Sequence, residues 1–243
     1  MIVYGTCVGG TGEKYNTISE PTIEPRLRDG DQAWALPGTE GICRVYNGFI
    51  DRARSADAEA LVLLHDDVEI TSRDFRARVL KAVREPDVGI AGTVGGAGLS
   101  SLAWWDARRL RGRVQESRGL VSFRPAEADV DAVDGMLLVL SPRALETVRF
   151  DEGSFPEFHG YDVDVCLQAR EAGLRVVTRQ LGVIHHTKGG FGDRSAFDRA
   201  ERALLRKWPH RVRPYTRTEN LKNKLRARLA SLERRVRAHG NFD

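Results

Sequence analysis

The sequence predicts an α/β fold, in which a mixed, mostly parallel sheet is flanked by helices and followed by a C-terminal helical extension. The first observation is a set of short, unbroken apolar runs such as Leu61-Val62-Leu63-Leu64, which are typical of strands buried on both faces. The second is that segments with helical periodicity separate these runs. The third is that apolar runs change abruptly to polar residues, which marks strand ends where ligands bind in open α/β sheets.

The expected strands and helices alternate along the chain. Apolar runs place strands at residues 2–8, 33–36, 61–64, 88–92, 136–140, 175–177 and 182–184. Apolar residues at helical spacing place helices at residues 39–53, 72–83, 161–172, 195–208 and 220–239. A further helix opens at Pro142, because proline is favoured in a first turn. Gly92, Gly95, Gly96 and Gly98 are expected to lead from the strand at 88–92 into a loop.

Composition indicates a soluble globular protein. The chain has 243 residues, of which 41% are hydrophobic and 30% charged. It contains no run of 18 apolar residues, and its N-terminus lacks the layout of a signal peptide. Three widely spaced cysteines, Cys7, Cys43 and Cys166, match no zinc spacing and are expected to be free thiols. A cytoplasmic location is therefore expected.

The charge distribution divides the chain into a body and a basic extension. Residues 194–243 carry 15 Lys/Arg and 5 Asp/Glu, whereas the preceding residues carry 23 and 29. We expect a folded domain at 1–192 and a basic helical extension at 193–243. The leucine stripe of 220–239 predicts self-association as a homodimer, and the basic charge predicts contact with an anionic surface. Nucleic-acid binding ranks last, since no recognition motif accompanies the charge.

The stretch from Leu61 to Glu69 is the most informative in the chain. Its apolar strand runs directly into His65-Asp66-Asp67. Side chains alternate along a strand, so His65 and Asp67 share a side while Asp66 points away. This arrangement suits a divalent cation held together with nucleotide phosphates, but it also suits a polar strand end that caps the next element. This stretch alone does not decide between the two.

Two further motifs present polar or aromatic groups. Asp134-Gly135 is a turn that exposes a carboxylate before an apolar strand. Trp104 and Trp105 are adjacent and therefore point in different directions, so an exposed one can stack on a sugar or a base. The alternative is that both are packed under a loop.

Two pairs of ionisable residues lie close together in the sequence. Asp162 and Asp164 lie about 200° apart in the first turn of one helix, so one of them at most faces a given cleft. A carboxylate in a first turn is stabilised as the anion by the helix dipole, and it serves either as a base or as a cap. His185-His186 ends a short apolar strand.

Taken together, these motifs resemble the family-2 glycosyltransferases of the GT-A fold, and in particular their streptomycin-biosynthesis-type branch. The similarity covers roughly residues 1–190. The matching motifs, in order, are Val45-Tyr46-Asn47-Gly48, Leu63-Leu64-His65-Asp66-Asp67-Val68-Glu69, Val133-Asp134-Gly135, the segment 158–167 followed by Ala172-Gly173, and Ile184-His185.

The resemblance implies an enzyme that transfers a sugar from a nucleotide-diphosphate sugar to an acceptor hydroxyl with inversion, using Mn²⁺ or Mg²⁺. Asp162 is the implied base. The implied nucleotide-sugar-binding residues are Thr6, Cys7, Val8, Arg44, Asn47, His65 and Asp66. The implied metal ligands are Asp67 and either His185 or His186. The implied acceptor-site residues are Trp104, Trp105, Asp134, Gly135 and Tyr161.

The sequence departs from the family pattern at two positions. The first carboxylate of the Asp-x-Asp motif is replaced by His65, and the glutamate of the Glu-Asp pair is replaced by Tyr161. Asp164 is an alternative base to Asp162. The altered motif also favours a second hypothesis, a non-catalytic sugar-nucleotide-binding or scaffold protein of the same fold.

Overall fold

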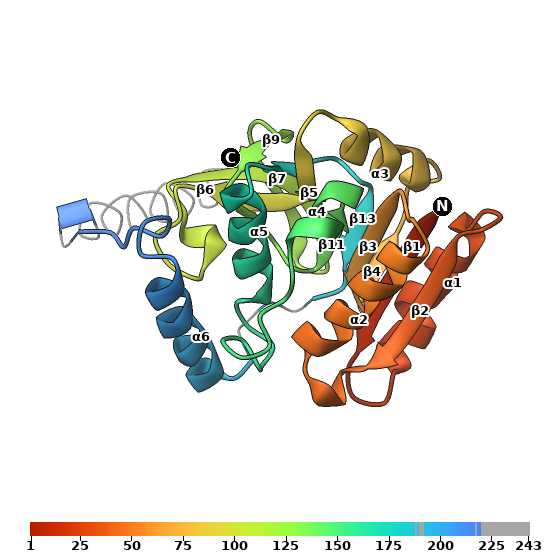
Figure 1. Ribbon diagram of the computed structural model, residues 1–243, viewed down its shortest axis with the longest axis horizontal. Coiled ribbons are helices and arrows are strands. Elements are labelled where there is room, and N and C mark those ends of the chain that lie inside the picture. Colours follow the sequence, from red (N-terminus) through yellow and green to blue (C-terminus); the bar gives the residue numbers. More distant parts are fainter. Residues whose placement is uncertain (188, 190–191, 217, 220–243) are drawn as a thin grey trace, which may run out of the picture. The chain divides into compact units, whose positions relative to one another are not determined.

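The computed structural model describes residues 1–187, 189, 192–216 and 218–219. The chain divides into a compact unit, Met1–Val212, and a second unit, Arg213–Asp243. The helix predicted at 220–239 lies outside the described residues. The architecture of the first unit is a mixed α/β fold built on two sheets (Figure 1).

The larger sheet has seven strands in the order β2-β1-β3-β11-β5-β12-β9. Five of them point the same way, while β11 and β9 run opposite to their neighbours. Six of the seven predicted strands and the mostly parallel sheet are thereby confirmed, while the strand predicted at 182–184 lies in the second sheet. The strands are β1 (Ile2–Val8), β2 (Gln32–Pro37), β3 (Ala60–His65), β5 (Val88–Gly92), β9 (Ala128–Val130), β11 (Leu137–Leu140) and β12 (Arg175–Thr178).

Helices cover both faces of this sheet. Phe49 of α2 (Ile42–Ser55) packs directly on Gly5 of β1, whereas Phe75 of α3 (Phe75–Arg84) meets the ring of Tyr4. Consecutive residues of a strand point to opposite faces, so α2 and α3 lie on opposite sides. Figure 1 shows α2, α4 (Pro142–Thr147) and α5 (Tyr161–Glu171) side by side on the face that carries α2.

Local signals begin and end these helices as the sequence predicts. The hydroxyl of Ser141 accepts a hydrogen bond from the amide of Ala144 and caps α4, whose first residue is Pro142. Gly173, at φ 80°, follows α5 and ends it. The short helix α1 (Glu20–Ile23) lies in the segment between β1 and β2, where the sequence predicted no regular element.

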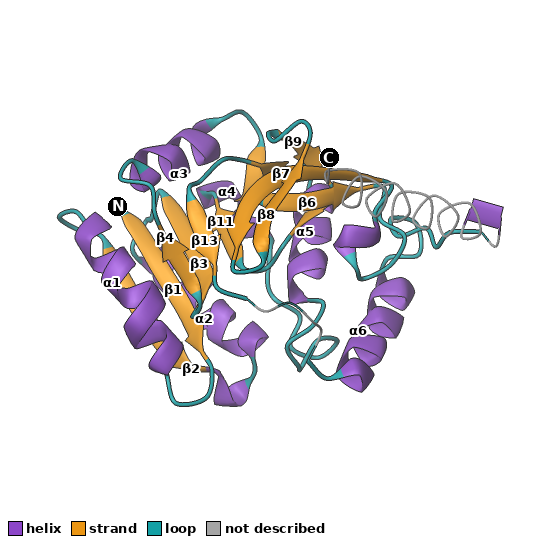
Figure 2. Ribbon diagram, turned by 180° about the vertical axis from the view of Figure 1, so that it is seen from behind, coloured by secondary structure: helices purple, strands orange, loops and turns teal. Residues whose placement is uncertain are grey.

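The second sheet was largely missed by the sequence analysis. It has the order β10-β6-β7-β13-β4, with β8 paired to β7, and Figure 2 shows β6, β7 and β8 as neighbours. The glycines after residue 92 were expected to lead into a loop, but Val94–Ala97 forms the strand β6. Gly95 lies there because a side chain would overlap the backbone of Ala132 in the adjacent strand. The strands are β4 (Val68–Ile70), β6 (Val94–Ala97), β7 (Arg109–Glu116), β8 (Gly119–Phe123), β10 (Ala132–Val133) and β13 (Val183–His185).

The compact unit continues beyond the boundary that the sequence placed after residue 192. It includes α6 (Arg194–Lys207), whose end is anchored on Asp164 of α5. The fully buried Asp164 carboxylate accepts hydrogen bonds from Trp208 Nε1 at 2.8 Å, from Gln168 Nε2 at 2.7 Å and from the Lys207 ammonium. Asp164 therefore points away from any cleft that Asp162 faces, as the helical spacing predicted. No helix among the described residues has the length and apolar character needed to span a membrane.

Removing the Asp164 carboxylate should destabilise the fold. Asp164→Ala leaves the Trp208 indole and the Lys207 ammonium without this partner, and breaking such a buried pair costs about 3–5 kcal/mol in the free energy of unfolding. Urea unfolding followed by circular dichroism measures the loss. The matched control is Asp198→Ala, which removes an exposed pair with Arg194 in α6 and should cost less than about 1 kcal/mol. Equal losses in the two variants would contradict this account.

Candidate functional site

The strand order brings three polar chain segments to one edge of the larger sheet. Cys7, near the end of β1, lies beside His65 at the end of β3. Because β11 runs antiparallel to β3, the turn before β11 lies at that same edge, and the His65 amide donates to the Met136 carbonyl at 3.0 Å. Asp134 and Gly135 of this turn therefore lie next to the His65-Asp66-Asp67 motif.

A fourth segment arrives through the smaller sheet. β13 pairs antiparallel with β4, so that His185 lies opposite Val68. The His186 amide donates to the Asp67 carbonyl at 2.9 Å. This register carries the His185 side chain to the Asp67 carboxylate, with 3.2 Å between His185 Nε2 and Asp67 Oδ1.

His65, Asp67 and His185 form a cluster whose ligand atoms all lie within 4.8 Å of one another. Asp67 is buried, and Lys14 Nζ lies 2.9 Å from its second oxygen, Oδ2. Burial raises the pKa of Asp67, but hydrogen bonds from His185 and Lys14 outweigh it and hold that pKa well below its usual range. Asp67 is therefore anionic at neutral pH.

The third member of the cluster is a neutral imidazole. Burial, and then the proximity of His185, lowers the pKa of His65 to about 4. Its Nε2 lies 2.6 Å from the hydroxyl of Tyr161, which fixes the ring orientation. Metal-binding histidines receive this kind of outer support in proteins. Two imidazoles and one carboxylate converging on one point are a donor set that fits a divalent transition-metal ion.

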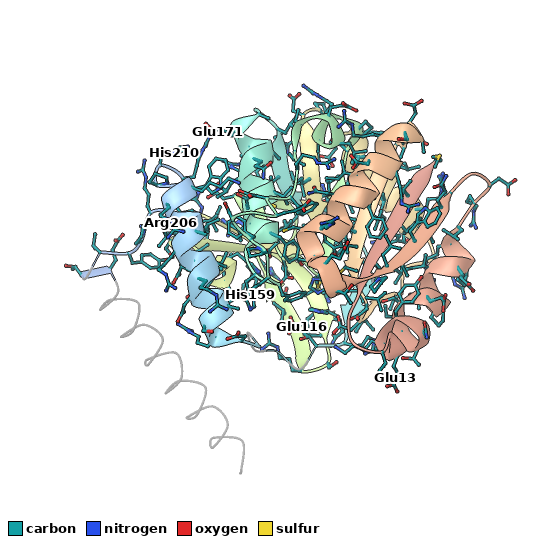
Figure 3. All side chains as sticks on the ribbon, turned by 60° about the horizontal axis from the view of Figure 1, so that its bottom comes forward. Glu13, Glu116, His159, Glu171, Arg206 and His210 are labelled. Atoms are coloured by element: carbon teal, nitrogen blue, oxygen red, sulfur yellow. The ribbon has the colours of Figure 1, made fainter. Side chains whose placement is uncertain are left out.

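The cluster opens into a cavity of about 1270 Å³. Its wall includes the turn after β1, the ends of β3 and β7, and the start of α5. Figure 3 labels three of its lining residues, Glu13, Glu116 and His159, which come from three separate parts of the chain. The volume is large enough for a nucleotide sugar and an acceptor group together.

Asp162 faces this cavity from the first turn of α5. Its Oδ2 accepts a hydrogen bond from the Gly135 amide at 3.1 Å. Burial, and then the charge of Asp134, raises the pKa of Asp162 to about 7, although hydrogen bonds from backbone amides oppose the rise. A first-turn position near the helix dipole favours the anion of Asp162, but burial beside a second carboxylate is the larger effect.

The turn opposite Asp162 has no room for a side chain. A Cβ at Gly135 would overlap the Tyr161 hydroxyl and approach Asp162 Cβ to 2.9 Å. Asp134 itself accepts a hydrogen bond from the Met136 amide at 2.8 Å, and burial raises its pKa. These contacts bring Asp134, Gly135, Tyr161 and Asp162 together, as the resemblance implied.

The two tryptophans differ in exposure, as their adjacency predicted. Trp104 is buried and Trp105 is 39% exposed, and their rings meet edge to face. Both line the cavity. Cys7, Val8 and Asp66 line it as well, and Asp66 Oδ2 accepts a hydrogen bond from the Gly9 amide at 2.9 Å.

Four residues named from the resemblance lie away from the cavity. Asn47 is buried and its amide binds the backbone of Phe150, so it braces the segment after α4. Arg44 pairs with Glu40 one turn earlier in the chain, and Thr6 is buried within β1. His186 lies 2.7 Å from Glu69, which leaves His185 as the histidine that meets Asp67.

Several lining residues were missed by the sequence analysis. Lys14 contacts Asp67 from beyond the Gly9-Gly10-Thr11-Gly12 turn, and that turn was the signal that could have found it. The others are Glu116 and Arg118 of the β7–β8 hairpin, Phe158 and Phe197. No local pattern marks them, because the cavity is assembled from segments distant in sequence.

Known proteins resemble this chain in sequence and in fold. A family model described as "Glycosyltransferase like family" matches residues 32–203. The streptomycin biosynthesis protein StrF of Streptomyces griseus is 36% identical over 193 residues, which are 78% of this chain and 68% of StrF.

Two solved structures share the fold. The mannosyltransferase PcManGT from Pyrobaculum calidifontis, in complex with GDP-Man and Mn²⁺, aligns with a TM-score of 0.53 at 12% identity and covers 94% of this chain and 80% of its own. GalNAc-T7 with UDP, GalNAc and Mn²⁺ aligns with a TM-score of 0.54 at 11% identity, over 84% of this chain and 48% of its own. The predicted GT-A fold is confirmed, and the chain belongs to the glycosyltransferase-like family.

Proposed function

We propose that this chain is a metal-dependent glycosyltransferase, which moves a sugar from a nucleotide-diphosphate sugar to an acceptor hydroxyl with inversion at the anomeric carbon. The observation that carries the proposal is one cavity that holds both a His-Asp-His cluster and a carboxyl group with a pKa of about 7. The two structural neighbours, which were solved with sugar nucleotides or their parts and with Mn²⁺, support it.

The donor occupies the side of the cavity formed by the turn after β1. Cys7, Val8 and the backbone of the glycine turn line this side, and Asp66 braces the turn through Gly9. Lys14 lies at the border between the turn and the cluster, where its ammonium contributes positive charge beside the diphosphate.

Asp67, His65 and His185 hold the cation. Nitrogen ligands favour Mn²⁺ over Mg²⁺, which prefers an all-oxygen shell. When bound, the ion would neutralise the negative charge that develops on the departing diphosphate. His65, which replaces the first carboxylate of the motif, is compatible with this role. Its pKa of about 4 keeps the imidazole neutral at pH 7, so a nitrogen lone pair is available and Asp67 supplies the negative charge.

Asp162 is the base. The acceptor oxygen forms a bond to the anomeric carbon, the bond from that carbon to the diphosphate oxygen breaks, and the hydroxyl proton passes to the Asp162 carboxylate. A pKa of about 7 makes Asp162 a stronger base than an ordinary carboxylate while part of it remains anionic at neutral pH. The Gly135 amide holds one of its oxygens in place.

The expectations about the extension stay predictions. Self-association as a homodimer depends on the leucine stripe of 220–239, which lies outside the described residues, and contact with an anionic surface depends on the basic charge of 194–243, of which the structure describes only part. The cytoplasmic location expected from the cysteines is likewise a prediction.

Asp162→Asn should abolish turnover while the site stays intact. The amide keeps the shape and an acceptor for the Gly135 amide but cannot take the proton, so kcat should fall by about 10²- to 10⁴-fold. Release of nucleoside diphosphate from a panel of sugar nucleotides with Mn²⁺ measures kcat. Calorimetric affinity for nucleoside diphosphate with Mn²⁺ should match that of the unaltered chain. Unchanged turnover would refute the role of Asp162.

The pH profile should report the environment of Asp162. Since the base must be anionic, kcat/KM should fall as the pH drops through about 7. Asp134→Asn removes the negative charge that raises the pKa of Asp162, so this acidic limb should move to lower pH. Asp129→Asn, which alters an exposed carboxylate paired with Arg175, is the control and should leave the limb in place. A limb that does not move in Asp134→Asn would contradict the assignment.

The two adjacent histidines should separate in a metal-binding experiment. His185→Ala removes a ligand and should weaken Mn²⁺ binding by at least about tenfold, measured by electron paramagnetic resonance of free Mn²⁺. His186→Ala is the matched control, because this side chain pairs with Glu69 and should leave the affinity unchanged. The reverse order of effects would assign the metal to His186.

A further inference from the structure

The Lys14 ammonium competes for the carboxylate of the metal-binding cluster. Its Nζ lies 2.9 Å from Asp67 Oδ2, while His185 Nε2 lies 3.2 Å from the other oxygen, Oδ1. Asp67 is the carboxylate of the cluster and supplies the negative charge that attracts a divalent cation. Lys14 already compensates this charge. A cation that binds Asp67 is therefore repelled by an ammonium held on the same side chain.

The backbone that carries Lys14 is tied to the cluster. Lys14 directly precedes the helical turn Tyr15–Ser19, whose last residue is fully buried. The Ser19 hydroxyl lies 2.9 Å from the carbonyl oxygen of Val68 and 3.2 Å from that of His65. These carbonyls flank the two aspartates of the motif in the chain. The distance from the Lys14 backbone to the cluster is thus set by the fold, and the side chain is the part that can move.

Lys14 is the exposed member of its ion pair. Its side chain is 61% exposed, whereas that of Asp67 is 10% exposed. A lysine side chain is long and flexible, so its ammonium can leave the carboxylate without a change in the backbone. Lys14 lines the cavity together with Gly9 and Gly10 of the preceding turn, where the proposed donor lies. A diphosphate on this side of the cavity offers the ammonium a second anionic partner.

We propose that Lys14 couples cation binding to nucleotide binding. Its ammonium opposes a divalent cation at Asp67 when no diphosphate is bound, and it transfers to the diphosphate when both ligands bind. The inference rests on the proposed function and assigns Lys14 a positioning role at that site. Coupling between two ligands is reciprocal, so the side chain that weakens binding of the cation alone strengthens binding of the two together.

The test compares two affinities of the full chain. Affinity for Mn²⁺ alone is measured by electron paramagnetic resonance of free Mn²⁺. Affinity for UDP, GDP, ADP and dTDP, each in excess Mn²⁺, is measured by calorimetry. Lys14→Met removes the charge and keeps the length of the side chain, and Lys14→Arg keeps the charge. The matched control is Lys81→Met, the same substitution at an exposed position of α3 that does not line the cavity.

The two affinities should change in opposite directions in Lys14→Met. Mn²⁺ alone should bind about tenfold more tightly, because the competing ammonium is gone, and the nucleotide in excess Mn²⁺ should bind about tenfold more weakly. Lys14→Arg and Lys81→Met should both follow the unaltered chain. A purely structural role of Lys14 would instead weaken both affinities. The inference is overturned if Lys14→Met leaves Mn²⁺ affinity unchanged or lowers it, or if its nucleotide affinity does not fall.

The same measurements separate failure of this inference from failure of the proposed function. If the unaltered chain binds Mn²⁺ and a nucleotide, and Lys14→Met changes neither affinity, the coupling role is wrong and the transferase proposal stands. If the unaltered chain binds no Mn²⁺, or none of the four nucleotides, the proposed function is refuted and the coupling role falls with it.

Discussion

The hydrogen bond between the Tyr161 hydroxyl and His65 Nε2, at 2.6 Å, is the contact on which the site depends. It joins the start of α5 to the end of β3, although the two residues lie far apart in sequence. The contact forms because Gly135 lacks a side chain, so the helix approaches the turn closely enough for the tyrosine to pass over it. The same approach places Asp162 against the Gly135 amide and orients His65 toward Asp67.

Two carboxylates in one cavity acquire opposite properties from their surroundings. Asp67 receives hydrogen bonds from His185 and Lys14, and its pKa is low despite burial. Burial and the charge of Asp134 raise the pKa of Asp162 to about 7, and hydrogen bonds from backbone amides offset only part of this rise. Under the proposed function, this separation of pKa values suits Asp67 to hold a cation and Asp162 to accept a proton.

Sequence reasoning succeeded where a local pattern carries the information. The order of strands and helices and the first-turn position of Asp162 follow from periodicity. His65 and Asp67 also come together, but across the turn that follows β3 and not by alternation along a strand, and Asp66 lines the same cavity. It failed for β6, whose Gly95 resembles loop sequence but serves a close strand contact. It also placed Asn47 in the site, because a polar residue on a helix gives no sign that its partner will be the backbone of Phe150.

By itself, the sequence determined the fold class and the residue types that carry the chemistry, since apolar periodicity and strand-end carboxylates are properties of short segments. The tertiary structure decided which of His185 and His186 meets Asp67, since that depends on the register of β13 against β4. It also decided the protonation of Asp162 and which side chains line the cavity. These depend on burial and on neighbours brought together across the chain, and no local spacing encodes either.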